Sequence, residues 1–449
     1  MSDPPFPVAP EAMSALERLW SNGNAGYLVG GGVRDALLGR SPHDPLWDLA
    51  TDALPERALE LFPEGTYENR FGTVLASGVE VTTFRRDHAY GDHRRPDKVT
   101  FTDSIEEDLA RRDFTVNAIA WGRAAGAVES DWVDPTGGRA DLEARLLRAV
   151  GDPGLRFSED ALRLVRAARI AAQVGLTIDP ATEAAMAAHA GDVSYLAMER
   201  IGRELRRMID ADPPSGAFRI LERTGLLEHL VPELAAQRGV PQAKIAGHDL
   251  WDHSLGTLDA AAALAPDDPL GKLAALLHDT GKPETSADGR FLGHEEAGDR
   301  IAQALLLRLG FGGADVRHVG RLVRHHMWSY VPAWSDAAVR RFMRRVGLDL
   351  VDDLLRLRQA DNVGSGWAPE AGGVRELADR IAEQRRLGAP LALADLAVNG
   401  DDVLAAVGGQ PGPWLGRILE RLLESVISDP GRNTRERLLG DARAWAAKR

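Results

Sequence analysis

Two short segments near the start of the chain contain the residue types that phosphate chemistry needs. Residues 29–40 hold three consecutive glycines after a short apolar run, and such a turn lets backbone N–H groups approach a polyphosphate because no Cβ intervenes. Just downstream, Asp44 and Asp48 can hold divalent metal ions for phosphoryl transfer. The segment predicts a triphosphate site in which Gly30 and Gly31 form the cradle and Asp44 and Asp48 are catalytic.

The spacing of those two aspartates is a difficulty for this interpretation. In a regular strand a four-residue step spans about 13 Å, too far for a shared metal pair. Pro45 cannot donate to a strand ladder, and a bulge would shorten the distance. We therefore expect residues 45–47 to bulge so that Asp44 and Asp48 converge. Otherwise the site is impaired, or Glu80 on a neighbouring predicted strand must compensate.

Cationic and polar residues near these segments suit a bound nucleotide. Arg34 can pair with phosphate oxygens, and Arg112 is a second anion partner. Asp113 can accept a hydrogen bond from a ribose hydroxyl, which favours ribonucleotides. Asn117 and Arg166 complete the residues expected to bind the nucleotide. The alternative for the segment at 111–118 is a helix cap held by salt bridges.

Asp160 and Arg163 are three residues apart, so on a helix they share one face. A carboxylate accepts from an exocyclic amino group, and a guanidinium donates to the ring acceptor beside it. Cytosine and adenine show that edge, whereas uracil and guanine show a carbonyl in place of the amino group. The pair predicts selection of CTP and ATP; an ordinary surface salt bridge is the alternative.

A second group of candidate ligands lies between residues 248 and 361. Histidine and carboxylate together suit a hard or borderline divalent metal that activates water. The candidates are His253, His278, Asp279, His294, His325 or His326, and Asp361. A domain that has lost this chemistry and retains only its fold is the alternative.

Composition and pattern bound the fold. The chain has 449 residues, a net charge of −13 and no cysteine, which excludes disulfides and thiolate metal sites. We expect strands at residues 27–29 and 79–84, a helix at 33–38, and a largely helical pattern from Ser158, the expected N-cap. No apolar run approaches the roughly 20 residues that span a bilayer. The predicted class is α+β, with an α/β head followed by helical domains.

In order along the chain, these motifs resemble the tRNA CCA-adding enzyme and bacterial poly(A) polymerase family, with an HD phosphohydrolase domain. The resemblance implies CCA addition from CTP and ATP at the tRNA acceptor end, Mg²⁺ in the head, an unidentified divalent metal in the HD domain, and a cytoplasmic protein. The family places its first aspartate where Leu46 stands here. The implied domains are a head (1–145), neck (146–212), body (213–244), HD domain (245–363) and tail (364–449).

Three alternatives remain open from the sequence. An enzyme that adds only the terminal adenosine and a poly(A) polymerase share the head motifs. The polar loop at 85–96 resembles an element of enzymes that add the terminal adenosine. The third alternative is an inactive head beside an HD domain that hydrolyses phosphate esters at RNA ends.

Overall fold

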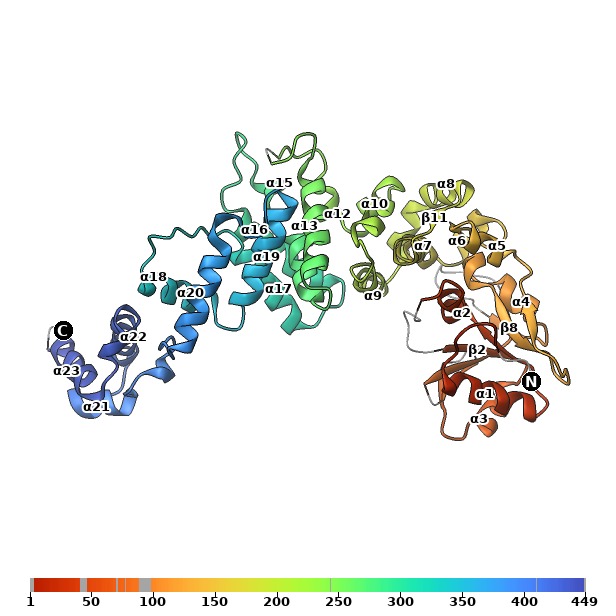
Figure 1. Ribbon diagram of the computed structural model, residues 1–449, viewed down its shortest axis with the longest axis horizontal. Coiled ribbons are helices and arrows are strands. Elements are labelled where there is room, and N and C mark those ends of the chain that lie inside the picture. The colour runs from red at the N-terminus through yellow and green to blue at the C-terminus, as the bar shows by residue number, and fades with distance from the viewer. Residues whose placement is uncertain are drawn as a thin grey trace. The chain divides into compact units, whose positions relative to one another are not determined.

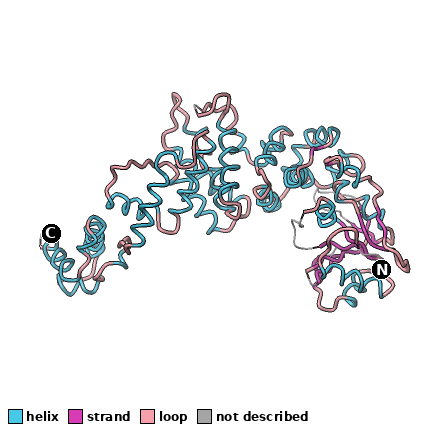
Figure 2. Tube along the Cα trace, in the orientation of Figure 1, coloured by secondary structure: helices cyan, strands magenta, loops and turns pink. Residues whose placement is uncertain are grey.

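The computed structural model describes residues 4–40, 47–69, 72–76, 78–88, 98–242, 244–408 and 410–447. Contacts divide the chain into two compact units (Figure 1): Met1–Ala235 with Arg308–Gly310, and Ala236–Leu307 with Phe311–Arg449. The strands gather in the first unit (Figure 2), and beyond the last of them the described residues form helices and loops. The predicted α+β class is confirmed. The finer domain boundaries stay predictions.

Seven strands of the first unit form one mixed sheet in the order β3-β4-β5-β2-β1-β8-β9. β2 and β5 pair in parallel, and the other neighbours are antiparallel. The seven are β1 (Gly26–Val29), β2 (Trp47–Thr51), β3 (Thr66–Asn69), β4 (Thr73–Ala76), β5 (Val79–Thr83), β8 (Ala120–Arg123) and β9 (Asp131–Val133). Two-stranded sheets pair β6 (Arg85–His88) with β7 (Lys98–Phe101), and β10 (Leu146–Leu147) with β11 (Thr177–Ile178).

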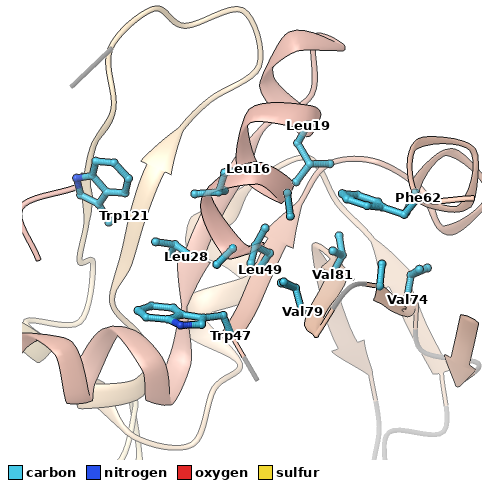
Figure 3. Close-up of a cluster of buried hydrophobic side chains, with 14 of the residues drawn as sticks. Leu16, Leu19, Leu28, Trp47, Leu49, Phe62, Val74, Val79, Val81 and Trp121 are labelled. Atoms are coloured by element: carbon cyan, nitrogen blue, oxygen red, sulfur yellow. The ribbon is translucent and has the colours of Figure 1, made fainter. Parts of the chain in front are cut away.

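The two faces of the large sheet differ because side chains alternate along each strand. On one face Leu28, Leu49 and Val81 join a buried cluster with residues of α1 (Pro10–Ser21) and α3 (Pro55–Leu61), as Figure 3 shows. On the other face the apolar residues pack with those of α4 (Ile105–Ala110). Asp48 alternates with Leu49, so its carboxylate is on this second face.

Several of the remaining helices of the first unit begin or end at capping, proline or glycine residues of the sequence. Asp152 caps the start of one of them through its side chain, as an N-cap aspartate does. They are α2 (Gly30–Leu37), α5 (Gly138–Glu143), α6 (Pro153–Glu159), α7 (Leu162–Val174), α8 (Pro180–Ala188), α9 (Met198–Met208), α10 (Ser215–Arg223), α11 (Leu226–Leu230), α12 (Pro232–Ala235), and the 3₁₀ turns η1 (Thr115–Asn117) and η2 (Ala190–Tyr195).

Two expectations about helix boundaries were wrong. Ser158 is not an N-cap: it lies inside α6, and its hydroxyl donates to the Leu155 carbonyl. The helix expected to begin at Val33 begins at Gly30, directly after β1. Both helices begin earlier than the pattern of polar and apolar residues indicates, one at Pro153 and the other at Gly30.

The second unit is helical among its described residues. Its metal-site candidates are on α13 and α19, which pack against each other, and on or directly after α14, α16 and α17. The helices are α13 (Leu250–Leu264), α14 (Pro269–Leu277), α15 (Lys282–Thr285), α16 (His294–Arg308), α17 (Gly313–His325), α18 (Asp336–Val346), α19 (Val351–Gly364), α20 (Val374–Arg386), α21 (Gly400–Val407), α22 (Pro413–Ser428), α23 (Arg435–Ala446), and the 3₁₀ turns η3 (Ala371–Gly373), η4 (Leu393–Asp395) and η5 (Pro430–Arg432).

A buried arginine bonds the end of α22 to α18 and α20 of this unit, beside exposed ion pairs from Arg341 and Arg344 to α22. Arg340 of α18 is 6% exposed and donates to the carbonyl oxygens of Ile427 and Ser428 at the end of α22, and to Gln384. A cation at a helix C-terminus satisfies unpaired carbonyls and the helix dipole together. None of the described helices is both long and apolar enough to cross a membrane.

Candidate functional site

The first unit contains a cavity of ≈ 370 Å³ on the second face of its sheet. Six arginines and three aspartates line it, an excess of positive charge that suits a polyanion such as a triphosphate. The lining residues are Val29, Asp48, Leu49, Thr73, Thr82, Arg85, Arg111, Arg112, Asp113, Asp160, Leu162, Arg163, Arg166 and Arg200.

Gly30 lies next to two residues that line this cavity, and a side chain at its position would displace one of them. Its φ is +76°, and a Cβ there would lie 2.5 Å from Oδ2 of Asp48 and 3.4 Å from Nη1 of Arg112. Because Gly30 has no side chain, the Asp48 carboxylate and the Arg112 guanidinium can both lie close to this turn. Gly31 is less constrained: the nearest atom to its Cβ would be Nη2 of Arg34, at 3.5 Å.

Asp48 has a second carboxylate beside it on the sheet. β2 and β5 run parallel with Asp48 and Glu80 as register partners, so the two side chains are on the same face. Thr82, two residues after Glu80 on that face, also lines the cavity. The predicted partner Asp44 and the predicted bulge at 45–47 fall at or beside residues 41–46, which lie outside the described part of the chain.

Arg34, predicted to bind phosphate, is hydrogen-bonded to residues within the protein. It is 7% exposed and bonds Oδ1 of Asp35 from Nε at 2.8 Å and Oδ1 of Asn117 from Nη1 at 2.8 Å. Asn117 in turn donates to Oδ1 of Asp113 at 3.1 Å, and Nε of Arg166 donates to Oδ2 of Asp113 at 2.8 Å. A continuous polar chain thus connects the glycine turn with α7.

Asp113 and Arg166 are ionised against the cost of burial. Burial opposes the charge on Asp113, but Arg166 and the hydrogen bond from Asn117 outweigh it and hold the pKa of Asp113 well below its usual range. The same carboxylate raises the pKa of Arg166. The pair therefore stays charged at neutral pH, with the Arg166 guanidinium at the cavity wall.

Asp108, which the sequence analysis did not single out, holds two of the arginines that line the cavity. It is 1% exposed and accepts from Nε and Nη2 of Arg111 and from Nη2 of Arg112. Burial opposes its charge, yet the two arginines lower its pKa. Within the described residues, Nε of Arg112 is buried without a hydrogen-bond partner. The signal was the spacing of three and four residues from Asp108.

Asp160 and Arg163 both line the cavity but do not share a continuous helix. α6 ends at Glu159, Asp160 is extended (φ −144°, ψ 106°), and Arg163 lies in the first turn of α7. Nη2 of Arg200 lies 3.1 Å from Oδ2 of Asp160, and Nη1 of Arg163 lies 2.5 Å from Oε2 of Glu159. The expected common face is replaced by a helix break that presents both side chains to one space.

In the second unit, four buried histidines are oriented alike, each with Nε2 toward the others and Nδ1 toward the backbone. The Nδ1 atoms of His253, His278, His294 and His326 lie 2.7–3.1 Å from backbone carbonyl oxygens. A carbonyl accepts, so each Nδ1 must be the protonated nitrogen. The Nε2 lone pairs are thereby left for a metal, which is how second-shell hydrogen bonds prepare histidine ligands.

Asp279 lies between two pairs of these histidines. Its Oδ2 is 3.4 Å from Nε2 of His253 and 3.1 Å from that of His278. Its Oδ1 is 3.4 Å from Nε2 of His294 and 3.5 Å from that of His326. The two triads share the Asp279 carboxylate, and each contains ligand types that could hold a divalent metal ion.

Charged neighbours complete the group. Oδ1 of Asp361 is 3.3 Å from Nε2 of His253, and Nζ of Lys282 is 2.6 Å from Oδ2 of Asp279. Burial opposes the charge on both carboxylates, but the surrounding histidines, and Lys244 beside Asp361, hold their pKa values well below the usual range. Burial lowers the pKa of His278 to about 4, so this imidazole is neutral at pH 7. The two carboxylates and His278 thus have the ionisation states that metal ligation requires, whereas for His253 burial is outweighed by hydrogen bonds to Asp279 and Asp361, which raise its pKa.

The two adjacent histidines left open by the sequence are now distinguished. His326 is 4% exposed and belongs to the second triad. His325 is half-buried, and burial and neighbouring arginines lower its pKa. The structure places His326, and not His325, in the group, together with the predicted His294.

Comparisons with known proteins match both units. A family model of the poly A polymerase head domain matches residues 26–148, and one of the HD domain matches residues 250–363. The CCA-adding enzyme of Geobacillus stearothermophilus is 32% identical over 452 residues, covering 99% of this chain and 98% of that enzyme. The A-adding tRNA nucleotidyltransferase of Deinococcus radiodurans is 35% identical over 419 residues, covering 89% and 90%.

The fold agrees with these sequence relatives. The crystal structure of the Bacillus stearothermophilus CCA-adding enzyme in complex with CTP superposes with a TM-score of 0.67 at 28% identity, and the match covers 98% of each chain.

Proposed function

The chain belongs to the family of CCA-adding enzymes, and we propose that it completes or repairs the CCA end of tRNA from CTP and ATP. The observation that carries this proposal is that Asp48 and Arg112, which line an arginine-rich cavity, both lie beside the Gly30 turn. That arrangement puts a metal-binding carboxylate beside an anion-binding group, as nucleotide transfer requires.

The head residues divide into three tasks. Asp48, with Asp44 or Glu80, would hold Mg²⁺, which when bound neutralises phosphate charge and activates the RNA 3′-hydroxyl. Arg111 and Arg112 are held by Asp108 and bind the triphosphate. The 3′-hydroxyl oxygen forms the new bond to the α-phosphorus as pyrophosphate leaves.

Two further groups read the nucleotide. Asp113 faces the ribose, since it lines the cavity beside Arg112. Asp160 and Arg163 present a carboxylate and a guanidinium to the base edge, where they favour the amino-plus-acceptor pattern of cytosine and adenine. The base takes the place of the present contacts with Arg200 and Glu159.

Product lengths test the proposal and separate its alternatives. Purified protein receives tRNA ending before CCA, after C and after CC, with CTP and ATP singly and together. We expect three, two and one additions with both nucleotides. Addition only to tRNA ending in CC indicates an A-adding enzyme, and long adenosine tails indicate a poly(A) polymerase.

Single substitutions identify the metal carboxylates in the same assay. Asp48→Asn is expected to abolish addition, because a ligand to the catalytic metal is lost. Comparing Asp44→Asn with Glu80→Gln then shows which carboxylate completes the pair. Full activity in Asp48→Asn would contradict the assignment of the head site.

A second activity is favoured by the shared carboxylate of the histidine group. We propose that two divalent ions would be held here, one by His253, His278, Asp279 and Asp361, and the other by Asp279, His294 and His326. When bound, such ions lower the pKa of a water for attack on a phosphate ester. The chain would then also remove phosphates from RNA or nucleotide ends.

Metal content provides the test, with adjacent residues as a matched pair. We expect two ions per chain in the Mn²⁺- or Ni²⁺-loaded protein. His326→Ala should retain one, and His325→Ala should retain both because its ring lies outside the group. Binding of no ion by the parent protein would refute the metal centre, and two bound ions without hydrolysis of 2′- or 2′,3′-cyclic phosphates would refute the activity alone.

A further inference from the structure

Two threonines of the large sheet line the same cavity as the arginines. Val74 of β4 and Val81 of β5 belong to the buried cluster on the first face of the sheet (Figure 3). Side chains alternate along a strand, so the adjacent Thr73 and Thr82 are on the second face, where both line the cavity. The two threonines are register partners, and their Oγ1 atoms lie 3.2 Å apart. The cavity therefore has a pair of neutral hydroxyls in addition to its charged residues.

This hydroxyl pair can bond a further polar group. Each threonine has one O–H donor and two acceptor lone pairs. The bond between them uses one of the two hydrogens, and neither side chain makes another hydrogen bond with the described residues. Thr73 is 6% exposed, so a hydrogen bond at this position is shielded from bulk water. A ribose 2′-hydroxyl both donates and accepts, and it complements such a pair.

The order of the strands places the pair across the carboxylates from the glycine turn. Gly30 comes directly after β1, and the next strands across the sheet are β2 with Asp48, β5 with Glu80 and Thr82, and β4 with Thr73. Neighbouring strands lie about 5 Å apart. The two threonines are therefore on the β5 and β4 side of Asp48, and Gly30 is on the β1 side.

The geometry of nucleotide transfer gives this arrangement a meaning. The attacking oxygen and the leaving group lie in line on opposite sides of phosphorus. With the triphosphate beside Gly30 and Arg112, pyrophosphate leaves on the β1 side. The RNA 3′-hydroxyl then approaches from the side of β5 and β4. The ribose that carries it is thereby brought to Thr82, which is two residues, or about 7 Å, beyond Glu80 along β5.

We propose that Thr82 and Thr73 bind the 2′-hydroxyl of the last ribose of the RNA and so position its 3′-hydroxyl for attack. This inference rests on the proposed nucleotide addition and specifies how that site holds the RNA end. Thr82, which is half-buried, makes the direct hydrogen bond, and Thr73 orients the Thr82 hydroxyl through the bond between them. The pair favours RNA that ends in ribose over RNA that ends in 2′-deoxyribose.

Two RNAs that differ in one oxygen test this contact. Acceptor-stem hairpins end in CC, with either cytidine or 2′-deoxycytidine as the last nucleotide, and kcat/KM for addition of ATP is measured with the full chain. The 2′-oxygen also affects the acidity of the 3′-hydroxyl, so the informative quantity is the change in the ratio of the two kcat/KM values between parent and variant. Thr82→Val should lower kcat/KM about 3- to 10-fold for the ribose-ended hairpin, as the loss of one hydrogen bond does, and leave the 2′-deoxy-ended hairpin unchanged.

Three further variants separate this contact from a role in the sheet. Thr82→Ser keeps the hydroxyl and should retain the parent ratio. The double variant Thr73→Val with Thr82→Val removes both partners of the bond, so it should melt near the parent temperature and show the ratio of Thr82→Val. Thr66→Val, at an exposed threonine of β3 in the same sheet, should change neither kcat/KM value. Equal losses on both hairpins in Thr82→Val would assign the pair to sheet stability and overturn the proposal.

A binding measurement separates this proposal from the nucleotide-addition activity. Dissociation constants of both hairpins are measured by fluorescence anisotropy in the presence of ATP and Ca²⁺. Thr82→Val should change their ratio about 3- to 10-fold by weakening only the ribose-ended hairpin. If the parent chain adds nucleotide to neither hairpin but this change occurs, the activity fails and the contact stands. If the parent chain is inactive and the ratio is unchanged, the contact is refuted as well.

Discussion

At the residue scale, the head site depends on one missing methyl group. Gly30 lets Oδ2 of Asp48 approach within 2.5 Å of the position that its Cβ would occupy. Real Cβ contacts are longer than this, so any side chain there displaces the carboxylate. Gly30 therefore determines where the Asp48 carboxylate lies, in addition to allowing the local backbone conformation.

A matched pair of glycines separates these two effects. Gly30 and Gly39 both have positive φ, +76° and +67°, but a Cβ at Gly39 would meet nothing within 4 Å. Each alanine pays a left-handed backbone cost of about 1–2 kcal/mol. We expect Gly39→Ala to retain nucleotide addition at a reduced melting temperature, and Gly30→Ala to lose it at least 100-fold. Equal losses of activity would show that strain alone is responsible.

Asp113 makes a pH-dependent contribution to stability. Its folded pKa is lowered by Arg166 and Asn117, so the contribution is complete above the unfolded pKa of about 3.9 and is lost as pH falls toward the folded value. Asp113→Asn should lower the free energy of unfolding by about 2 kcal/mol at pH 7. Thermal melts should show a gap between parent and variant that narrows below about pH 4. A gap that is constant with pH would contradict the ionic origin.

At the scale of elements, the sequence predicted the parts that local chemistry determines. The strand before the glycine turn, the strand at 79–84 and the helical second half follow from apolar pattern and turn residues. The break between α6 and α7 did not, because the extended Asp160 is paired with Arg200 on α9, forty residues away. The roles of Arg34 and His326 likewise depend on tertiary partners that spacing does not reveal.

The helix break leads to a prediction about base choice. If Asp160 accepts from the exocyclic amino group, Asp160→Ala should reduce the preference for CTP over UTP by roughly 10- to 100-fold, since a good base contact is worth about 1–3 kcal/mol. Single-nucleotide addition with each of the four triphosphates measures this. Glu183→Gln, which alters an acid paired with Arg223 on other helices, serves as the control. Preserved selectivity in Asp160→Ala would assign base reading elsewhere.

At the scale of the whole molecule, the two candidate sites lie in separate compact units. Each has its own carboxylates, around Asp48 in the first unit and around Asp279 in the second. We expect Asp279→Asn to add CCA at the parent rate while losing metal and phosphate hydrolysis. Asp48→Asn should show the reverse pattern. Loss of both activities in either variant would indicate that the units depend on each other.

The polar chain from Asp35 through Arg34, Asn117 and Asp113 to Arg166 has a mechanical consequence. It connects the glycine turn, the proposed phosphate site, with α7, which carries the proposed base-selecting Arg163. A nucleotide with the wrong base that displaces α7 would also displace the glycine turn through these hydrogen bonds. The identity of the base would then affect the position of the reacting phosphorus as well as the contacts at the base edge.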